Sequence, residues 1–162
     1  MAAMTKLTRN QFIPFLDVTK DTTFTSSSWK QIDYSTIFEL TMNENEEDMD
    51  YICFANAVTE INGNQPELPQ EIACYEGNPI YDFMFNEFFN MPVGSDVKVP
   101  FLMCFGGTEK KAWRCVATIT SKVLNTVDGK ITFSIKMGGN IEKGTYAITS
   151  GAPTFTKSGG KF

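Results

Sequence analysis

Residues 111–137 read KAWRCVATITSKVLNTVDGKITFSIKM, and this stretch decides the fold class. Apolar and polar side chains alternate on both sides of Asp128-Gly129, a dipeptide that favours a tight hairpin turn. Strict alternation puts one set of side chains on each face of a β-strand. We therefore expect an amphipathic hairpin with one apolar face and one polar face, the latter rich in threonine.

A similar alternation runs from Trp29 to Thr41 and predicts a long, half-buried strand. The acidic stretch 42–50 follows and is expected to be a solvated loop. Apolar residues between Asp50 and Val58 predict a return strand, so that these segments would form a second long hairpin. Residues 1–28 are expected to be an N-terminal arm or edge strand with a linker, because they contain Pro14.

One helix is predicted, and it begins at Gly77-Asn78-Pro79, where asparagine caps and proline fits the first helical position. The helix is expected to end near Met91-Pro92. Its aromatic residues fall on more than one stripe, which predicts burial on two sides, either in the chain's own core or against a neighbouring copy. The residues expected there are Tyr81, Phe85, Phe88 and Phe89.

The remaining sequence predicts one strand over 97–105, one last strand over 144–156 and a loose tail at 157–162. A chain of 162 residues fits a single domain, here 1–162. The whole pattern indicates a mainly antiparallel β-fold with one helix.

Composition removes several classes of function. The chain has no histidine, which excludes serine-histidine and cysteine-histidine catalysis. Its four cysteines form no CxxC pair, and no phosphate-binding, dinucleotide-binding or metalloprotease motif occurs. We expect no enzyme activity, metal or cofactor. An isoelectric point near 4.8 argues against tight nucleic-acid binding. Neither a membrane span nor a signal sequence is predicted.

Charge is distributed unevenly along the chain. Residues 31–97 contain 14 of the 19 acidic residues and no lysine or arginine, whereas residues 98–162 contain ten basic and three acidic residues. Solvent-exposed faces can differ in this way by chance. The distribution also fits self-complementarity, in which an acidic patch of one copy binds a basic patch of the next copy.

The order of motifs resembles the major tail tube proteins of tailed bacteriophages. The matching features are a strand led by Trp29-Lys30-Gln31-Ile32, an acidic loop, a Gly77-Asn78-Pro79 segment similar to the family's Gly-Asp-Pro helix start, and a closing strand with Gly144-Thr145-Tyr146. Asn78 stands where the family commonly has aspartate. The resemblance covers most of the chain from about residue 29.

This resemblance implies a β-sandwich or partly rolled barrel that assembles as stacked hexameric rings and forms the conduit for DNA ejection. DNA would pass as cargo without specific binding. Lumen-lining candidates are Asp33, Ser35, Glu39, Thr118, Thr120, Thr132 and Ser134, and candidates for contact between rings are Glu44, Glu46, Glu47, Asp48 and Asp50. Arg114 and Lys136 share the inferred polar face, where they would pair with Asp33 or Glu39.

By the same resemblance, the partners would be further copies of the chain, a tape measure protein, a tail terminator and distal tail proteins. The protein would be assembled in the host cytoplasm and located in the virion tail. Two alternatives stay open. One is a tail terminator or connector, which forms a single ring, and the other is a non-enzymatic β-sandwich module that binds, for instance, carbohydrate.

Overall fold

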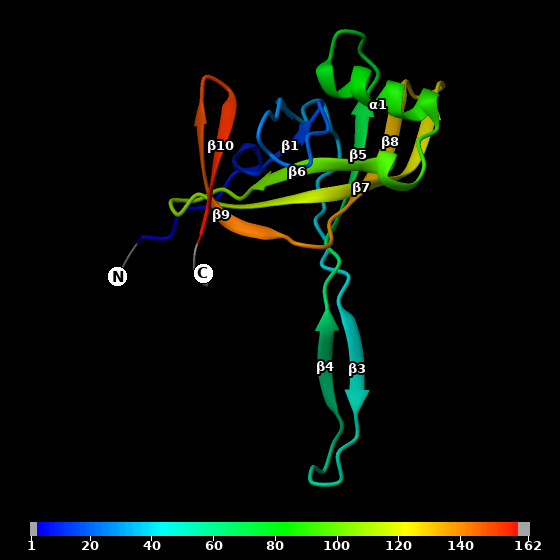
Figure 1. Ribbon diagram of the computed structural model, residues 1–162. Helices are drawn as coiled ribbons and strands as arrows, with labels where there is room; N and C mark the ends of the chain where they lie inside the picture. The colour runs from blue at the N-terminus through cyan, green and yellow to red at the C-terminus, as the bar shows by residue number, and fades with distance from the viewer. Residues whose placement is uncertain (1–2, 159–162) are drawn as a thin grey trace.

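The computed structural model describes residues 3–158, which form an antiparallel β-structure with one α-helix (Figure 1). The predicted fold class is therefore confirmed. Residues 159–162, most of the predicted tail, lie outside the described residues. The helical elements are η1 (Arg9–Gln11), α1 (Pro79–Asn90) and η2 (Gly94–Val97). The strands are β1 (Ile13–Asp17), β2 (Trp29–Gln31), β3 (Asn45–Met49), β4 (Val58–Gly63), β5 (Glu67–Ala73), β6 (Lys98–Cys104), β7 (Lys111–Asn125), β8 (Lys130–Lys136), β9 (Glu142–Thr149) and β10 (Ala152–Lys157).

Strand β7 organises an eight-stranded sheet. Its 15 residues pair with β6 on one side, and on the other side they pair first with β9 and then with β8. The sheet therefore divides at β7 into a β10-β9 branch and a β8-β5 branch, while β6 continues to β1 and β2. The predicted β7-β8 hairpin is confirmed, and Gly129 takes the left-handed backbone conformation that its turn requires.

The main hydrophobic core lies on one face of this sheet, under α1. Ile80 and Met84 of the helix pack there with residues such as Ile119 and Ile135 from the strands. A smaller cluster around Phe15, Leu102 and Tyr146 covers part of the opposite face. Both faces of β6 are thus buried, whereas the smaller cluster does not reach β8 or the second half of β7, where buried residues alternate with more exposed ones.

Helix α1 begins and ends where the sequence predicts. The Asn78 side chain accepts a hydrogen bond from the Ile80 amide at 3.0 Å, Pro79 occupies the first helical position, and Met91 ends the helix with a left-handed backbone. The chain's own core buries the helix on one side, so burial on two sides within one chain is wrong, and burial of the second side against a neighbouring copy stays a prediction. Only one stripe, which includes Ile80 and Met84, is buried, and the second stripe is open to solvent.

Strand β1 lies between β6 and β2, so the expected edge position is wrong. Pro14 is tolerated because pairing with β2 stops beside it. Its carbonyl oxygen accepts a hydrogen bond from Ile32, just beyond the end of β2, and its missing N–H would have pointed to the same side. Asp17 then accepts hydrogen bonds from the Thr19, Asp21 and Ser28 amides and closes the following loop.

The predicted long hairpin of 29–41 with 50–58 is absent from the described chain. Strand β2 stops at Gln31, Tyr34 takes a left-handed backbone, and the chain then follows the outer edge of β5 through isolated bridges at Ser35 and Thr41. The hairpin that forms is β3-β4. The predicted acidic loop supplies its first strand, and the predicted return strand supplies its connecting turn.

The last predicted strand is a hairpin of two strands, β9 and β10. Ser150 and Gly151, both with positive φ, form the turn between Thr149 and Ala152. A side chain at Gly144 of β9 would collide with the carbonyl oxygen of Thr156, so the close approach of these strands requires glycine there.

Candidate functional site: a polar sheet face and a projecting hairpin

The β5-β8-β7 branch carries a polar face on the side opposite α1. The strands bring together Thr118, Thr120, Thr132 and Ser134, the lumen candidates of the second predicted hairpin, because Thr120 pairs with Ser134 and Val123 with Thr132. Their neighbours Ala117, Ile119, Ile131, Phe133 and Ile135 point into the core. The period-two prediction of this face therefore holds in the geometry. We call these four residues, with the charged residues between them, the polar face.

Charges on the polar face are mixed. Its bases are Lys98, Lys130 and Lys136, and its acids are Glu67 and Glu71. Lys130 forms an ion pair with Glu71 at 2.6 Å, and Lys98 donates a hydrogen bond to the Thr118 hydroxyl at 2.6 Å. Of these three lysines, only Lys136 was expected on this face from the sequence. The pairing of β6 with β7 and of β5 with β8 places them there, and no local pattern reveals that pairing.

Both glutamates are held in their ionised form. A hydrogen bond from the Ser134 hydroxyl is the main cause that lowers the pKa of Glu67, and the amide of Asn43 adds to it. A hydrogen bond from Lys130, and then one from the Thr36 hydroxyl, lowers the pKa of Glu71. Hydrogen bonds thus fix both glutamates, Ser134 and Thr118 in place, whereas the Thr120 hydroxyl is buried without a hydrogen-bond partner. Ser134 is also buried.

The candidates from the first predicted hairpin do not join this face. Asp33 lies at the start of α1, where its carboxylate accepts a hydrogen bond from the Asn78 side chain at 3.2 Å. Ser35 and Glu39 belong to the irregular segment along β5. Asp33, Ser35 and Glu39 were expected on one face of a regular hairpin strand, because polar and apolar residues alternate there. The chain forms no such strand at these residues.

Arg114 was expected to pair with Asp33 or Glu39. It forms an ion pair with Glu142 of β9 instead, at 2.7 Å. Its guanidinium group also lies between two aromatic rings, 4.3 Å from the centroid of Phe24 and 4.6 Å from that of Phe155. Arg114 therefore connects the 18–28 loop with the C-terminal strand, and it has a structural role.

The β3-β4 hairpin projects from the body of the molecule as a separate two-stranded sheet (Figure 1). Nearly every residue from 43 to 62 is exposed. All five candidates for contact between rings, Glu44, Glu46, Glu47, Asp48 and Asp50, lie on or next to β3. We call strands β3 and β4 the stalk and residues 51–57 the tip.

The stalk contains few contacts of its own beyond its backbone ladder. Glu47 lies directly opposite Glu60, a pairing of like charges. Thr59 donates a hydrogen bond to Asp48 at 2.7 Å, Asn62 donates one to Glu47 at 3.0 Å, and Tyr51 donates one to Glu60 at 2.8 Å. The last contact raises the pKa of Tyr51.

The described residues hold no cluster of histidine, cysteine or acidic side chains that fits a metal ion. In the same part of the chain, no helix is both long and apolar enough to cross a membrane.

Several solved structures have a similar fold. The chain is similar to the tube terminating cap of the anti-feeding prophage, with 12% identity, a TM-score of 0.57 and coverage of 90% of this chain and 95% of that chain. It is also similar to a chain in the tail of an empty GTA particle with C6 symmetry, with 14% identity, a TM-score of 0.58 and coverage of 93% and 99%. The fold is that of tail proteins.

A third similar structure is the sheath/tube terminator of an extracellular contractile injection system, PVC, in its extended state, with 10% identity, a TM-score of 0.51 and coverage of 88% and 99%. No family model matches the sequence, and no curated protein matches it. The fold is therefore shared over most of the chain with little sequence identity.

Proposed function

We propose that this chain is a structural, non-catalytic tail protein whose copies join into hexameric rings that stack into a hollow tube. DNA would pass through the tube during ejection. The tail-protein fold supports a place in such an assembly, and the C6 symmetry of one similar structure supports six copies in a ring. The main support for stacking of rings is the β3-β4 hairpin, which projects from the body of the molecule (Figure 1).

A two-stranded hairpin without a hydrophobic face is marginally stable in water. Here both faces of the stalk are exposed, and the Glu47–Glu60 pair opposes the cross-strand pairing. The extended conformation is therefore expected to gain its stability from another molecule. In a stack of rings, the next ring provides that surface, and its basic groups offset the charge of the stalk.

Ring closure would use the free edges of the main sheet. Strands β2 and β10 end the longest path through the sheet, and each has one side without a paired strand in the described chain. An exposed strand edge is a template for pairing with another chain, and a closed ring removes such edges. Neighbouring copies would in this way join their sheets around a common bore.

The polar face is proposed to line this bore. Threonine and serine hydroxyl groups offer no fixed charge, and Lys130 is neutralised by Glu71. Lys136 lies opposite Glu67 in the strand register. Lys130 would therefore hold phosphate weakly, and the Glu67 carboxylate would reduce the attraction of Lys136 for phosphate. Lys98 donates a hydrogen bond to the Thr118 hydroxyl and is the base of this face that would still attract phosphate. DNA would slide along such a wall without being retained.

A tail terminator is the second candidate function. Two of the similar structures are a tube terminating cap and a sheath/tube terminator, with TM-scores of 0.57 and 0.51 against 0.58 for the tail chain. A terminator would form the same ring but would not extend into a filament. In either role, the protein would reside in the virion tail beside proteins such as a tape measure protein.

A carbohydrate-binding module is less well supported. Such a module would present aromatic rings on a sheet face, but no exposed aromatic side chain lies on a strand of the main sheet in residues 3–158. The exposed aromatic residues lie instead on α1, on the hairpin tip and in the loops around Tyr34 and Tyr75.

Sedimentation velocity and negative-stain electron microscopy over a range of protein concentrations test this proposal. Hollow rods built from rings are expected for a tube subunit, and single rings that do not lengthen would assign the terminator role. A monomer at every concentration would overturn both.

A further inference from the structure

Among the apolar surfaces that the fold leaves open in residues 3–158, two lie far apart. One is the hairpin tip, residues 51–57, where Ile52 and Phe54 are exposed and the rings of Tyr51 and Phe54 meet edge to face at 6.2 Å. The tip contains no charged residue, although five acidic residues precede it in 44–50. An uncharged apolar end on an acidic stalk is typical of an interaction surface.

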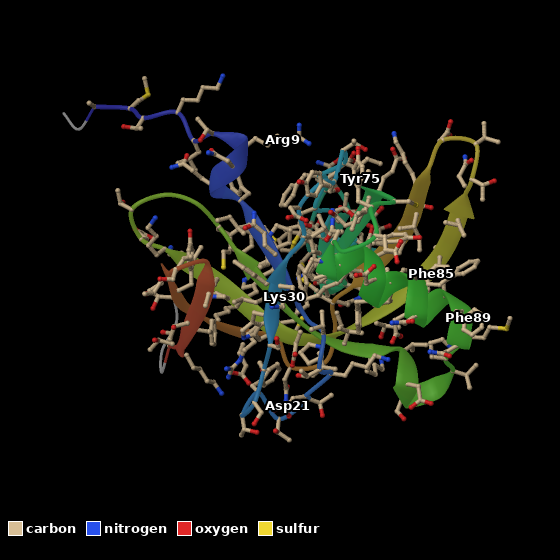
Figure 2. All side chains as sticks on the ribbon, turned by 90° about the horizontal axis from the view of Figure 1, so that it is seen from above. Arg9, Asp21, Lys30, Tyr75, Phe85 and Phe89 are labelled. Carbon is tan, nitrogen blue, oxygen red and sulfur yellow. The ribbon has the colours of Figure 1, made fainter. Side chains whose placement is uncertain are left out.

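The other open surface is a row of aromatic side chains on α1, formed by Tyr81, Phe85 and Phe89, which we call the aromatic ridge. Spacing of four residues puts the three rings on one face of the helix, and they are adjacent at 6.1 Å and 6.3 Å between centroids. Phe89 is 70% exposed. Figure 2 shows Phe85 and Phe89 pointing away from the body of the molecule.

Apolar residues after the helix enlarge this surface. Met91 and Val93 are exposed beyond the end of α1. The nearest helical acid on the buried side, Glu87, is already paired with Lys20 at 2.5 Å. The half-buried carboxylate of Asp82 lies near Tyr81 at the start of this face, and the rest of the ridge presents uncharged, largely aromatic atoms, as the tip does. Aromatic pairs of this kind gain energy beyond the area they bury.

The tip and the ridge lie at opposite ends of the molecule. In Figure 1 the hairpin extends downward from the sheet, and α1 lies at the upper end. The tip therefore cannot fold back onto the ridge of its own chain. Copies that follow one another along the direction of the hairpin bring the tip of one copy toward the helix side of the next. Such a head-to-tail contact uses different surfaces on the two copies and can repeat without limit.

We propose that the hairpin tip of one copy binds the aromatic ridge of a copy in the adjacent ring. This inference rests on the stacked rings of the proposed function and names the surface that receives the hairpin. The stalk then serves as an acidic spacer, and the apolar tip supplies the contact that is buried between rings.

Native Cys53 provides a direct probe, because it is the exposed cysteine of the described chain and lies in the tip. Cys104 and Cys115 are buried, and burial raises the pKa of each thiol to about 12, which keeps both unreactive. The variant Asn86→Cys places a second thiol beside Phe85 and Phe89 and leaves the ridge intact. Asn86 is exposed, so the fold is expected to tolerate the change.

Assembled Asn86→Cys protein is treated with a short bismaleimide cross-linker and examined on a denaturing gel. A ladder of linked chains is expected, and adding Cys53→Ser is expected to abolish it. Ile148→Cys, on β9, is the matched control and is expected to give no ladder. Half-buried Cys74 is present in every variant, so the parent protein, treated with the same cross-linker, shows any ladder that Cys74 causes.

The outcomes separate the two proposals. Assembled tubes without an Asn86→Cys ladder, or with an equal ladder from Ile148→Cys, would overturn the tip-to-ridge contact and leave the tube intact. A parent protein that never assembles would overturn the proposed function itself. The double variant Phe85→Ala/Phe89→Ala is expected to keep rings but lose stacking, whereas tubes of unchanged length would contradict the contact.

Discussion

At the scale of single residues, Asn78 explains a departure from the tail tube pattern. The side-chain oxygen of Asn78 caps α1, and its amide group donates a hydrogen bond to Asp33 at 3.2 Å. Aspartate, which the resembling family commonly has at this position, would cap the helix equally well. It would also place two carboxylates against each other. The choice of asparagine therefore follows from the neighbouring Asp33.

This contact predicts a pH-dependent effect of Asn78→Asp. Two adjacent carboxylates repel each other until one of them binds a proton, so the variant is expected to be less stable than the parent at neutral pH. The difference is expected to narrow as the pH falls toward about 4, where carboxyl groups begin to protonate. Thermal unfolding at several pH values measures this. A difference that does not change with pH would contradict it.

Arg114 gives a second prediction at this scale. Arg114→Met removes the ion pair with Glu142 and the stacking with Phe24 and Phe155, so we expect a loss of about 1–3 kcal/mol in the free energy of unfolding. Lys111→Met, which removes an exposed ion pair on the same strand, is the control and is expected to have a much smaller effect. If chemical denaturation gave the same loss of unfolding free energy for both variants, the stacking of Arg114 on the two rings would not stabilise the fold.

At the scale of elements, the sequence predicted correctly where strong local signals occur. The Asp128-Gly129 turn and the alternation around it specify β7-β8, and the Asn78-Pro79 cap specifies α1. These signals act over a few residues and do not depend on the rest of the fold. The four hydroxyl residues of the polar face were grouped correctly for the same reason.

Prediction failed for residues 29–63, for one reason in the segment along β5 and for another in the hairpin. The alternating residues 32–41 do not form a regular strand, because they follow the edge of β5 through isolated bridges. The acidic residues 44–50 read as a loop, since strands are depleted in such residues. They form β3 nonetheless, because a hairpin that is exposed on both faces needs no apolar alternation.

The acidic residues of the stalk are expected to contribute to the contact between rings. Reversing its charge with Glu46→Lys, Glu47→Lys and Asp48→Lys is expected to weaken stacking of rings. The hairpin itself should persist, because Glu47→Lys puts an ammonium group opposite Glu60. Tube length in electron micrographs measures stacking, and circular dichroism reports the fold.

The matched control is Glu76→Lys with Asp96→Lys and Glu109→Lys, which changes the net charge equally at exposed positions outside the hairpin. Stacking that weakens equally in both sets would assign the effect to net charge alone. Unchanged tube length in the stalk variant would remove the stalk from the contact between rings.

At the scale of the whole molecule, the uneven charge along the chain follows the architecture. The acidic segment 31–97 contains the projecting stalk, whereas the basic segment 98–162 contains β6 to β10, which form most of the main sheet. A protein that projects an acidic arm from a more basic sheet suits head-to-tail assembly. Helix α1 belongs to the acidic segment, so the basic complement of the stalk must come from the sheet and not from the aromatic ridge. The fold shared with tail proteins agrees with such an assembly.

A helical reconstruction of the assembled protein by electron cryomicroscopy tests the central claim most directly. We expect six-membered rings in which Thr118, Thr120, Thr132 and Ser134 face the bore and each β3-β4 hairpin reaches the adjacent ring. An assembly whose polar face is turned outward, or whose hairpins contact only copies in their own ring, would contradict it.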